Sequence, residues 1–244
     1  MAENGYLDQG ERAKSALILA HGQPSDPDPA ARELEALAAL VAAHLPGWDL
    51  RAATLAQPGA LSRVGGDMAP GLVFPVFMAA GWFTRVAVPA RMAEAGLEGW
   101  RMLEPMGCAG PVQDLAVRIV RESGADQVLV AAHGSGGRSP APAAVARGVA
   151  ERIGREAGVA RAEAAFIEQA PWLNQVSGWD AGAVCLPFFA MSGGHVTHDL
   201  PEALREAGFP GRILPALGLH PEIPALIAGL IREGAGLAAT PPGR

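Results

Sequence analysis

The sequence predicts an α/β protein made of two tandem flavodoxin-like halves, each with a parallel sheet flanked by helices, and with a cleft between the halves. Two observations predict this fold: short apolar runs alternate with amphipathic segments, and the whole pattern occurs twice at one constant shift along the chain. Strands that alternate with helices favour right-handed crossovers, and these produce a parallel sheet covered on both faces. At 244 residues, length alone would allow one large domain or two of ordinary size.

The internal repeat is marked by two histidine-glycine pairs. The shift that carries His21 onto His133 superposes further landmarks: Pro75 on Pro187, Phe77 on Phe189, Gly81 on Gly193 and Pro89 on Pro201. So many matches in one register are hard to obtain by chance, although a chain rich in alanine and glycine will match itself more often at those two residue types. We therefore divide the chain into a first half, residues 15–125, and a second half, residues 126–233.

The elements of each half follow from the periodicity of their apolar residues. In the first half, a helix is expected over Pro29–His44, with an apolar stripe formed by Leu34, Leu37, Leu40 and Val41. In the second half, three short apolar runs are typical of buried strands: Gln127–Ala132, Arg161–Ile167 and Gly182–Phe189. A helix is predicted over Ala141–Ala157, because Val145, Val149, Ile153 and Ala157 recur at every fourth position.

Composition excludes several classes of function. No apolar stretch approaches the ~20 residues that cross a bilayer, and the polar start of the chain lacks the features of a secretory signal, so we expect a soluble, cytoplasmic protein with no membrane partner. A net charge of -6 without a basic cluster argues against nucleic acid. Cys108 and Cys185 are too few for a disulfide framework or a cysteine zinc site. Residues 1–14 and 234–244 are expected to be flexible tails.

Three polar side chains follow strands of the second half. His133 comes directly after the first strand, Glu168 follows the strand that ends at Ile167, and His195 lies in the glycine-rich loop after Phe189. Ligands of parallel sheets bind beyond the carboxyl ends of the strands, so we expect the three to converge. Two imidazoles and one carboxylate suit Fe(II), Co(II), Ni(II) or Zn(II) and leave coordination positions open. The pattern therefore predicts a site that receives a divalent metal and releases it.

Each of these residues has a plainer interpretation when it is taken alone. A histidine before glycine at a strand end is often a turn residue, Glu168 could be a solvent-facing charge or a helix cap, and His195 with His198 could be a solvated pair. Their joint placement favours the metal site. Asp199, which follows His195 by one helical turn, is placed to orient that loop or to cap the helix that begins near Pro201. For His44 and His220 we expect a helix end and a turn.

These residues resemble the class II tetrapyrrole chelatases, the sirohydrochlorin cobaltochelatase and ferrochelatase group, in a long two-repeat form. The matching segments are Ala131–Ser135, Leu186–Phe189, Gly194–Pro201 and Leu217–Pro221, with Phe74–Gly81 and Val88-Pro89 in the first half. The resemblance spans nearly the whole chain, and a strand-end HG paired with a distant GHxxxDxP is fairly specific. It implies a chelatase-like fold and a metal site formed by His133, Glu168 and His195.

The first half departs from this pattern. His21 persists, but the shift that carries it onto His133 places Ala56 where Glu168 stands and Phe83 where His195 stands. The three positions are spaced identically along the chain in both halves, so these are substitutions and not a misalignment. We expect one catalytic half faced by one degenerate half.

The resemblance implies insertion of Co(II) or Fe(II) into an anionic tetrapyrrole such as sirohydrochlorin, in cobalamin or siroheme biosynthesis. The metal is then a substrate, and no cofactor is retained. His133 and His195 would serve as ligands and bases, and Glu168 as ligand or proton acceptor, because two pyrrole N–H protons must leave. The candidates for contact with the tetrapyrrole are His21, Ser135, Arg138, Arg85, Gly194 and His198.

Other functions stay open at this point. A carrier that binds a tetrapyrrole or a metal without turnover would need the same residues. A serine hydrolase is suggested by His133-Gly-Ser-Gly-Gly137, which resembles an oxyanion-hole sequence, but the chain has no G-x-S-x-G elbow. A histidine phosphatase is weaker still, because Ala20 and Ala132 stand before the histidines where arginine is expected. The sequence names neither the metal nor the oligomeric state.

Overall fold

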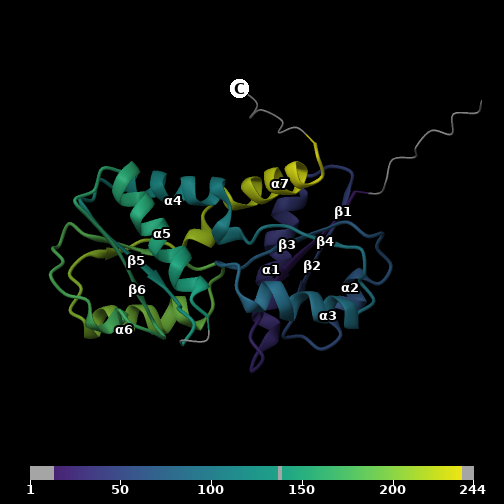
Figure 1. The fold of residues 1–244 in the computed structure, drawn as a ribbon, viewed down its shortest axis with the longest axis horizontal. Coiled ribbons are helices and arrows are strands. Elements are labelled where there is room, and N and C mark those ends of the chain that lie inside the picture. Colours follow the sequence, from purple (N-terminus) through teal and green to yellow (C-terminus); the bar gives the residue numbers. More distant parts are fainter. Residues whose placement is uncertain (1–13, 137–138, 238–244) are drawn as a thin grey trace, which may run out of the picture.

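The computed structural model describes residues 14–136 and 139–237. It contains two four-stranded parallel sheets of the same strand order, β2-β1-β3-β4 and β6-β5-β7-β8, flanked by helices (Figure 1). The predicted α/β fold with two tandem halves is confirmed. Within the described residues, no helix combines the length and the apolar character needed to cross a membrane.

The elements of the first half are β1 (Lys14–Ala20), α1 (Pro27–Ala42), β2 (Trp48–Thr54), α2 (Ala60–Gly65), β3 (Leu72–Pro75), the π-helical turn η1 (Phe83–Ala87), α3 (Val88–Glu94), β4 (Arg101–Met102), the 3-10 turn η2 (Met106–Cys108) and α4 (Gly110–Ser123). Those of the second half are β5 (Gln127–Ala132), α5 (Ala141–Glu156), β6 (Arg161–Phe166), η3 (Leu173–Gln175), β7 (Val184–Pro187), the π-helical turn η4 (His195–Asp199), α6 (Leu200–Glu206), β8 (Arg212–Ile213), η5 (Leu217–Leu219) and α7 (Ile223–Gly234).

The expected apolar stripe of α1 is wrong at one position. Leu40 is 58% exposed, and the residues that face the core are Ala31, Leu34, Ala38 and Val41. At about 100° per residue, Leu40 lies about 120° around the helix from Leu34, which carries it off the buried face. In α5, the buried face likewise uses small residues, with Ala143 and Ala146 buried and Val145 only partly so.

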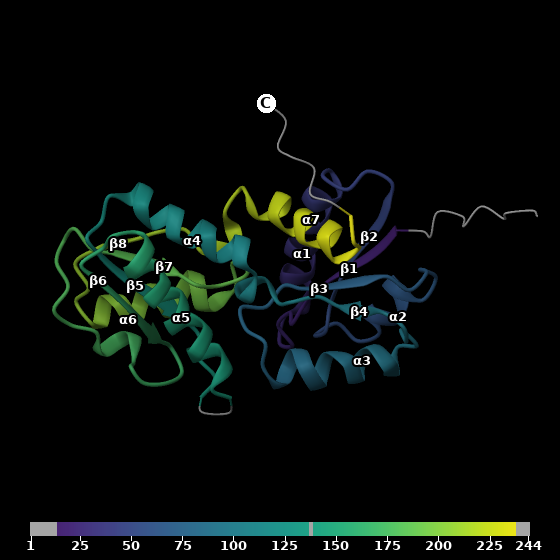
Figure 2. The same cartoon turned by 45° about the horizontal axis from the view of Figure 1, so that its top comes forward.

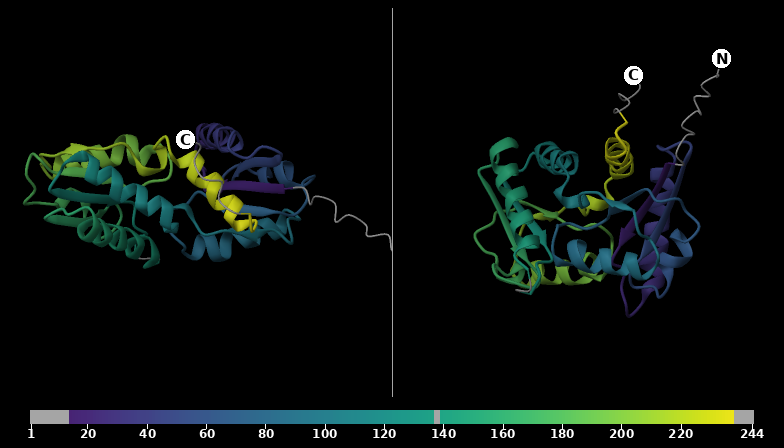
Figure 3. Two further views of the ribbon diagram at one scale, coloured as in Figure 1. Left: turned by 90° about the horizontal axis from the view of Figure 1, so that it is seen from above. Right: turned by 45° about the vertical axis from the view of Figure 1, so that its right-hand side comes forward.

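The last helix of each half packs against the other half. α4 contacts α5 and β7, whereas α7 contacts α1 and β3, and Figures 1 and 2 both show α7 lying beside α1. Polar contacts stabilise this packing of each helix on the other half. Arg152 of α5 pairs with Asp114 of α4, and Nη1 of Arg232 in α7 donates to the carbonyl of His44 at 2.6 Å. One large apolar core, which includes Phe74 and Phe166, therefore runs through both halves, and α7 crosses between them when seen from above (Figure 3).

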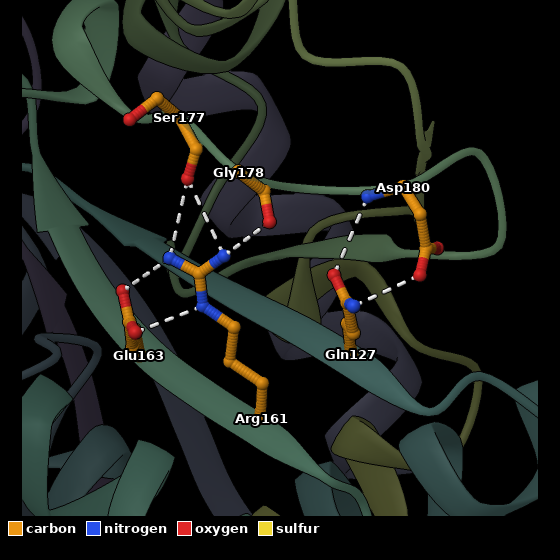
Figure 4. A network of polar contacts seen from close by, with 6 residues as sticks. All are labelled: Gln127, Arg161, Glu163, Ser177, Gly178 and Asp180. Carbon is orange, nitrogen blue, oxygen red and sulfur yellow. Dashed lines mark hydrogen bonds and ion pairs between the residues drawn. The ribbon is translucent and has the colours of Figure 1, made fainter.

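A polar network fixes the loop that enters β7, at the amino ends of β5 and β6 (Figure 4). Arg161 donates to both carboxylate oxygens of Glu163, at 2.8 and 3.0 Å, and to the carbonyl of Gly178 at 2.7 Å. Its guanidinium carbon also lies 3.8 Å from the centroid of a Trp179 ring. In the first half the same two strand positions hold Asp49 and Arg51, which pair with the charges reversed. The network lies at the end of the sheet opposite to the site described next.

Candidate metal site

His133 and Glu168 leave the sheet side by side, because β5 and β6 are parallel and in register. The ladder extends one step beyond the strands: the backbone N–H of Glu168 donates to the carbonyl of His133 at 2.9 Å. The chain turns sharply after His133 at Gly134, which has φ +81°. A Cβ at Gly134 would lie 2.8 Å from Cγ of Gln169, so both the backbone angle and the space require glycine.

The sequence predicts that His195 lies in a glycine-rich loop. In the structure, His195 instead begins the π-helical turn η4. This turn places Asp199 so that Nδ1 of His195 donates to its Oδ2 at 2.6 Å. Of the two roles predicted for Asp199, orientation of the His195 loop is therefore the one that the geometry supports, and α6 has no side-chain cap. A histidine whose Nδ1–H is held by a carboxylate presents Nε2 as its free ligand atom.

The three side chains grouped by the sequence lie together. Nε2 of His133 is 2.9 Å from Nε2 of His195 and 3.6 Å from Oε1 of Glu168. Nδ1 of His133 donates to the carbonyl of Gly134 at 3.2 Å, so the Nε2 atoms of both histidines face the common space. All three side chains are between 36% and 46% exposed, which leaves this space accessible from solvent.

The three donors do not form a ready metal cage. No group of three or more His, Cys, Asp or Glu side chains in residues 14–136 and 139–237 is spaced to hold an ion. Metal–nitrogen bonds of about 2.0–2.1 Å in a tetrahedral site place two ligand nitrogens about 3.4 Å apart, whereas the two Nε2 atoms lie 2.9 Å apart. The two rings would have to separate slightly to admit a metal.

The first half repeats this scaffold but keeps only one of the three side chains, His21. The backbone N–H of Ala56 donates to the carbonyl of His21 at 2.9 Å, as Glu168 does to His133. The π-helical turn η1 begins at Phe83, the counterpart of His195, and its ring lies against His21 with centroids 4.6 Å apart. Ala87 stands at the position of Asp199. The first half has therefore lost the carboxylate and one imidazole of the site and also the orienting carboxylate.

The remaining candidates for contact with the tetrapyrrole are exposed or partly exposed, or lie outside the described residues. The Ser135 backbone N–H donates to Oε1 of Gln169 at 2.9 Å, and its hydroxyl donates to the Ser139 carbonyl, so both groups hold their own loop. Gly194 is exposed and precedes η4, and Arg85 and His198 are exposed on η1 and η4. Arg138 lies outside the described residues.

One residue near the site gave no signal in the sequence. Glu33 of α1 accepts hydrogen bonds from Ser192, in the segment that leads to His195. The two residues are 159 positions apart and belong to no motif. The two histidines left without a site role behave as expected: His44 follows the end of α1, and Nδ1 of His220 accepts from the backbone N–H of Glu222 in a turn.

Comparison with known proteins identifies the family of this chain. The CbiX family model matches residues 127–234, the half that carries His133, Glu168 and His195. A solved structure of CbiX, the terminal enzyme for biosynthesis of siroheme in denitrifying bacteria, is 43% identical and has a TM-score of 0.83, with 92% of this chain and 100% of that chain covered. The chain belongs to the CbiX family of class II chelatases.

More distant solved structures share the fold. SirB from Bacillus subtilis with Fe3+ is 15% identical over 92% of this chain and 96% of its own, with a TM-score of 0.70. The sirohydrochlorin chelatase SirB from Bacillus subtilis subspecies spizizenii, in complex with cobalt, is 16% identical over the same shares, with a TM-score of 0.69. These two likenesses show that the common fold extends over nearly all of this chain. No match was found among curated protein sequences.

Proposed function

We propose that this protein inserts Co(II) or Fe(II) into sirohydrochlorin and that His133, Glu168 and His195 hold the metal before its transfer. The observation that carries the proposal is the convergence of these three side chains at the carboxyl ends of the strands, in a member of a chelatase family. The 43% identical relative acts in siroheme biosynthesis, which favours Fe(II) as the physiological metal.

The donor set suits a metal that arrives and leaves. A metal held by two imidazoles and one carboxylate keeps open positions at which ring nitrogens of a tetrapyrrole can bind. Ring nitrogens can then replace the protein ligands one after another. The partial exposure of all three side chains gives both the metal and a large substrate a route to the site.

The same residues account for the protons. Insertion of a divalent metal replaces two pyrrole N–H protons, so two protons must be taken up by bases as the metal leaves its protein ligands. Nε2 of His133 and Nε2 of His195 lie 2.9 Å apart. One of these imidazoles can accept one proton once the metal has left it, and Glu168 or solvent can accept the other.

The hydrolase alternative loses support from the hydrogen bonds of its serines. The Ser135 hydroxyl donates to the Ser139 carbonyl, and the Ser192 hydroxyl donates to Glu33. A nucleophilic serine is usually activated by a histidine, and neither hydroxyl is hydrogen-bonded to one.

The test follows the absorbance change of sirohydrochlorin after addition of Co(II), or of Fe(II) without oxygen. We expect wild type to accelerate metallation above the rate in buffer and His133→Ala to lose that acceleration. If wild type and His133→Ala both match buffer, the chelatase proposal is wrong. Tight stoichiometric binding of sirohydrochlorin by wild type without metallation would instead identify a carrier.

A further inference from the structure

We propose that Glu33, which belongs to the first half, is a positioning residue for the metal ligand His195 of the second half. Oε1 of Glu33 accepts the backbone N–H of Ser192 at 2.7 Å, and Oε2 accepts the Ser192 hydroxyl at 2.7 Å. Each carboxylate oxygen thus holds one donor of the same residue. The role of His195 in this inference rests on the proposed function, but the contact itself is tested below by metal binding alone.

The contact acts at the point where the turn that carries His195 begins. Ser192 precedes Gly193, whose carbonyl accepts the backbone N–H groups of Val196 at 2.8 Å and Thr197 at 3.3 Å. Those bonds start η4, and His195 is its first residue. A shift of Ser192 would therefore move the Gly193 carbonyl and the whole turn with it.

The segment has few other restraints. Gly193 and Gly194 are exposed, and nothing lies within 4 Å of the position of a Cβ at either glycine. Glycine also gives the backbone its widest conformational freedom. A metal ligand must be held to within about 0.5 Å of its productive place, so two charge-assisted hydrogen bonds from a rigid helix supply what this segment lacks.

The contact between Glu33 and Ser192 has no counterpart between the equivalent residues of the repeat. The shift that carries His21 onto His133 takes Glu33 onto Val145 and, in reverse, Ser192 onto Ala80. Neither residue has a polar side chain, so the second half cannot hold the turn of the first half in the same way. The Glu33 carboxylate therefore contacts the segment that leads to η4 and His195. For η1, which begins at Phe83, the equivalent position in the other half holds Val145 and offers no carboxylate. In this way the degenerate half takes part in the geometry of the metal site.

The experiment measures Co(II) binding to the full chain by equilibrium titration, together with the visible absorption bands of bound Co(II). For Glu33→Ala we expect the Kd for Co(II) to rise about 10-fold and the bands to change, because His195 is no longer held in place. Glu33→Gln should fall between Glu33→Ala and wild type, since its amide oxygen keeps one acceptor. Glu35→Ala is the matched control, because Glu35 is exposed on the same helix, and it should bind Co(II) like wild type.

The outcomes separate a positioning role from a merely structural one. If Glu33→Ala lowers the unfolding temperature but keeps the wild-type Kd and Co(II) spectrum, the proposal is overturned. If Glu33→Ala does not fold, Ser192→Ala decides: it removes one of the two bonds, so a Kd raised about 3-fold, the equivalent of one ordinary hydrogen bond, supports the proposal, and an unchanged Kd overturns it. A wild-type protein that binds Co(II) but does not metallate sirohydrochlorin would defeat the proposed function and leave this inference standing.

Discussion

The ring of Phe83 lies against the ring of His21, with centroids 4.6 Å apart, as the ring of His195 lies against His133 at 4.3 Å. Phe83 and His195 occupy equivalent positions of the repeat, and each is the first residue of a π-helical turn. A phenyl ring thus stands in the first half where an imidazole stands in the second, and it packs on the equivalent histidine at a different interplanar angle, 43° against 78°. The first half therefore has the backbone scaffold of the proposed metal site, with the apolar side chain of Phe83 where the second half has His195.

Restoring the missing side chains should create a second metal site. The triple variant Ala56→Glu, Phe83→His, Ala87→Asp supplies both lost ligands and the orienting carboxylate on a backbone that already has the required turn. We expect Co(II) titration to give two ions per chain where wild type binds one. The single variant Ala56→Glu is the control and should still bind one. A triple variant that is folded by circular dichroism and binds only one ion would show that the two scaffolds are not equivalent.

Loss of His195 should slow metallation strongly without unfolding the protein. His195 is partly exposed and contributes little to the core, so His195→Ala should fold normally and metallate sirohydrochlorin at least about 100-fold more slowly. The absorbance assay measures the rate, and circular dichroism reports the fold. His44→Ala, at an exposed position after α1, is the control. Equal rates for the two variants would remove His195 from the site.

Asp199 should act on metal affinity through His195. Its carboxylate accepts Nδ1–H of His195 at 2.6 Å, and removal of such a partner frees the ring to rotate and lowers its basicity. Asp199→Ala should therefore weaken Co(II) binding about 10- to 100-fold. Glu202→Ala, with an exposed carboxylate on α6, should leave the Kd unchanged. A wild-type Kd for Asp199→Ala would mean that η4 alone orients the histidine.

The convergence of His133, Glu168 and His195 could be predicted from the sequence because each of them follows a strand, and parallel strands bring their carboxyl ends to one edge. His133 and Glu168 needed only the correct strand ends, which apolar runs mark clearly. The repeat then identified Phe83 and Ala56 as substitutions. These inferences depend on local patterns and on one rule of topology.

The features that escaped prediction depend on contacts between distant segments. The exchange of α4 and α7 leaves no local pattern, because an amphipathic helix looks the same whichever sheet it covers. The contact between Glu33 and Ser192 joins residues 159 positions apart. The π-helical turn of η4 is defined by backbone bonds, so the residues around Gly194 resembled an ordinary glycine-rich loop.

The two cysteines should differ in reactivity. Burial raises the pKa of both the Cys108 and the Cys185 thiols, and Cys185 is completely buried. The thiolate is the reactive form, so in the native protein at pH 8 we expect iodoacetamide to label Cys108 slowly and Cys185 not at all. Because the Cys108 pKa is raised, its labelling rate should keep increasing as the pH rises above 9. Peptide mass spectrometry with and without urea gives the comparison, and rapid native labelling of Cys185 would contradict its burial.

Arg161 should contribute to stability and not to metal binding. Its guanidinium donates to Glu163 and to the carbonyl of Gly178 (Figure 4). It also lies over the face of Trp179, at the end of the sheet opposite to the proposed metal site. Arg161→Ala removes these contacts together, so the free energy of unfolding in urea should fall by about 2 kcal/mol. Arg205→Ala, which loses only an exposed pair with Glu202, should change it by less than about 0.5 kcal/mol. The Kd for Co(II) should stay at the wild-type value in both variants. A higher Kd for Co(II) in Arg161→Ala would show that a shift of the loop entering β7 also shifts the turn that carries His195.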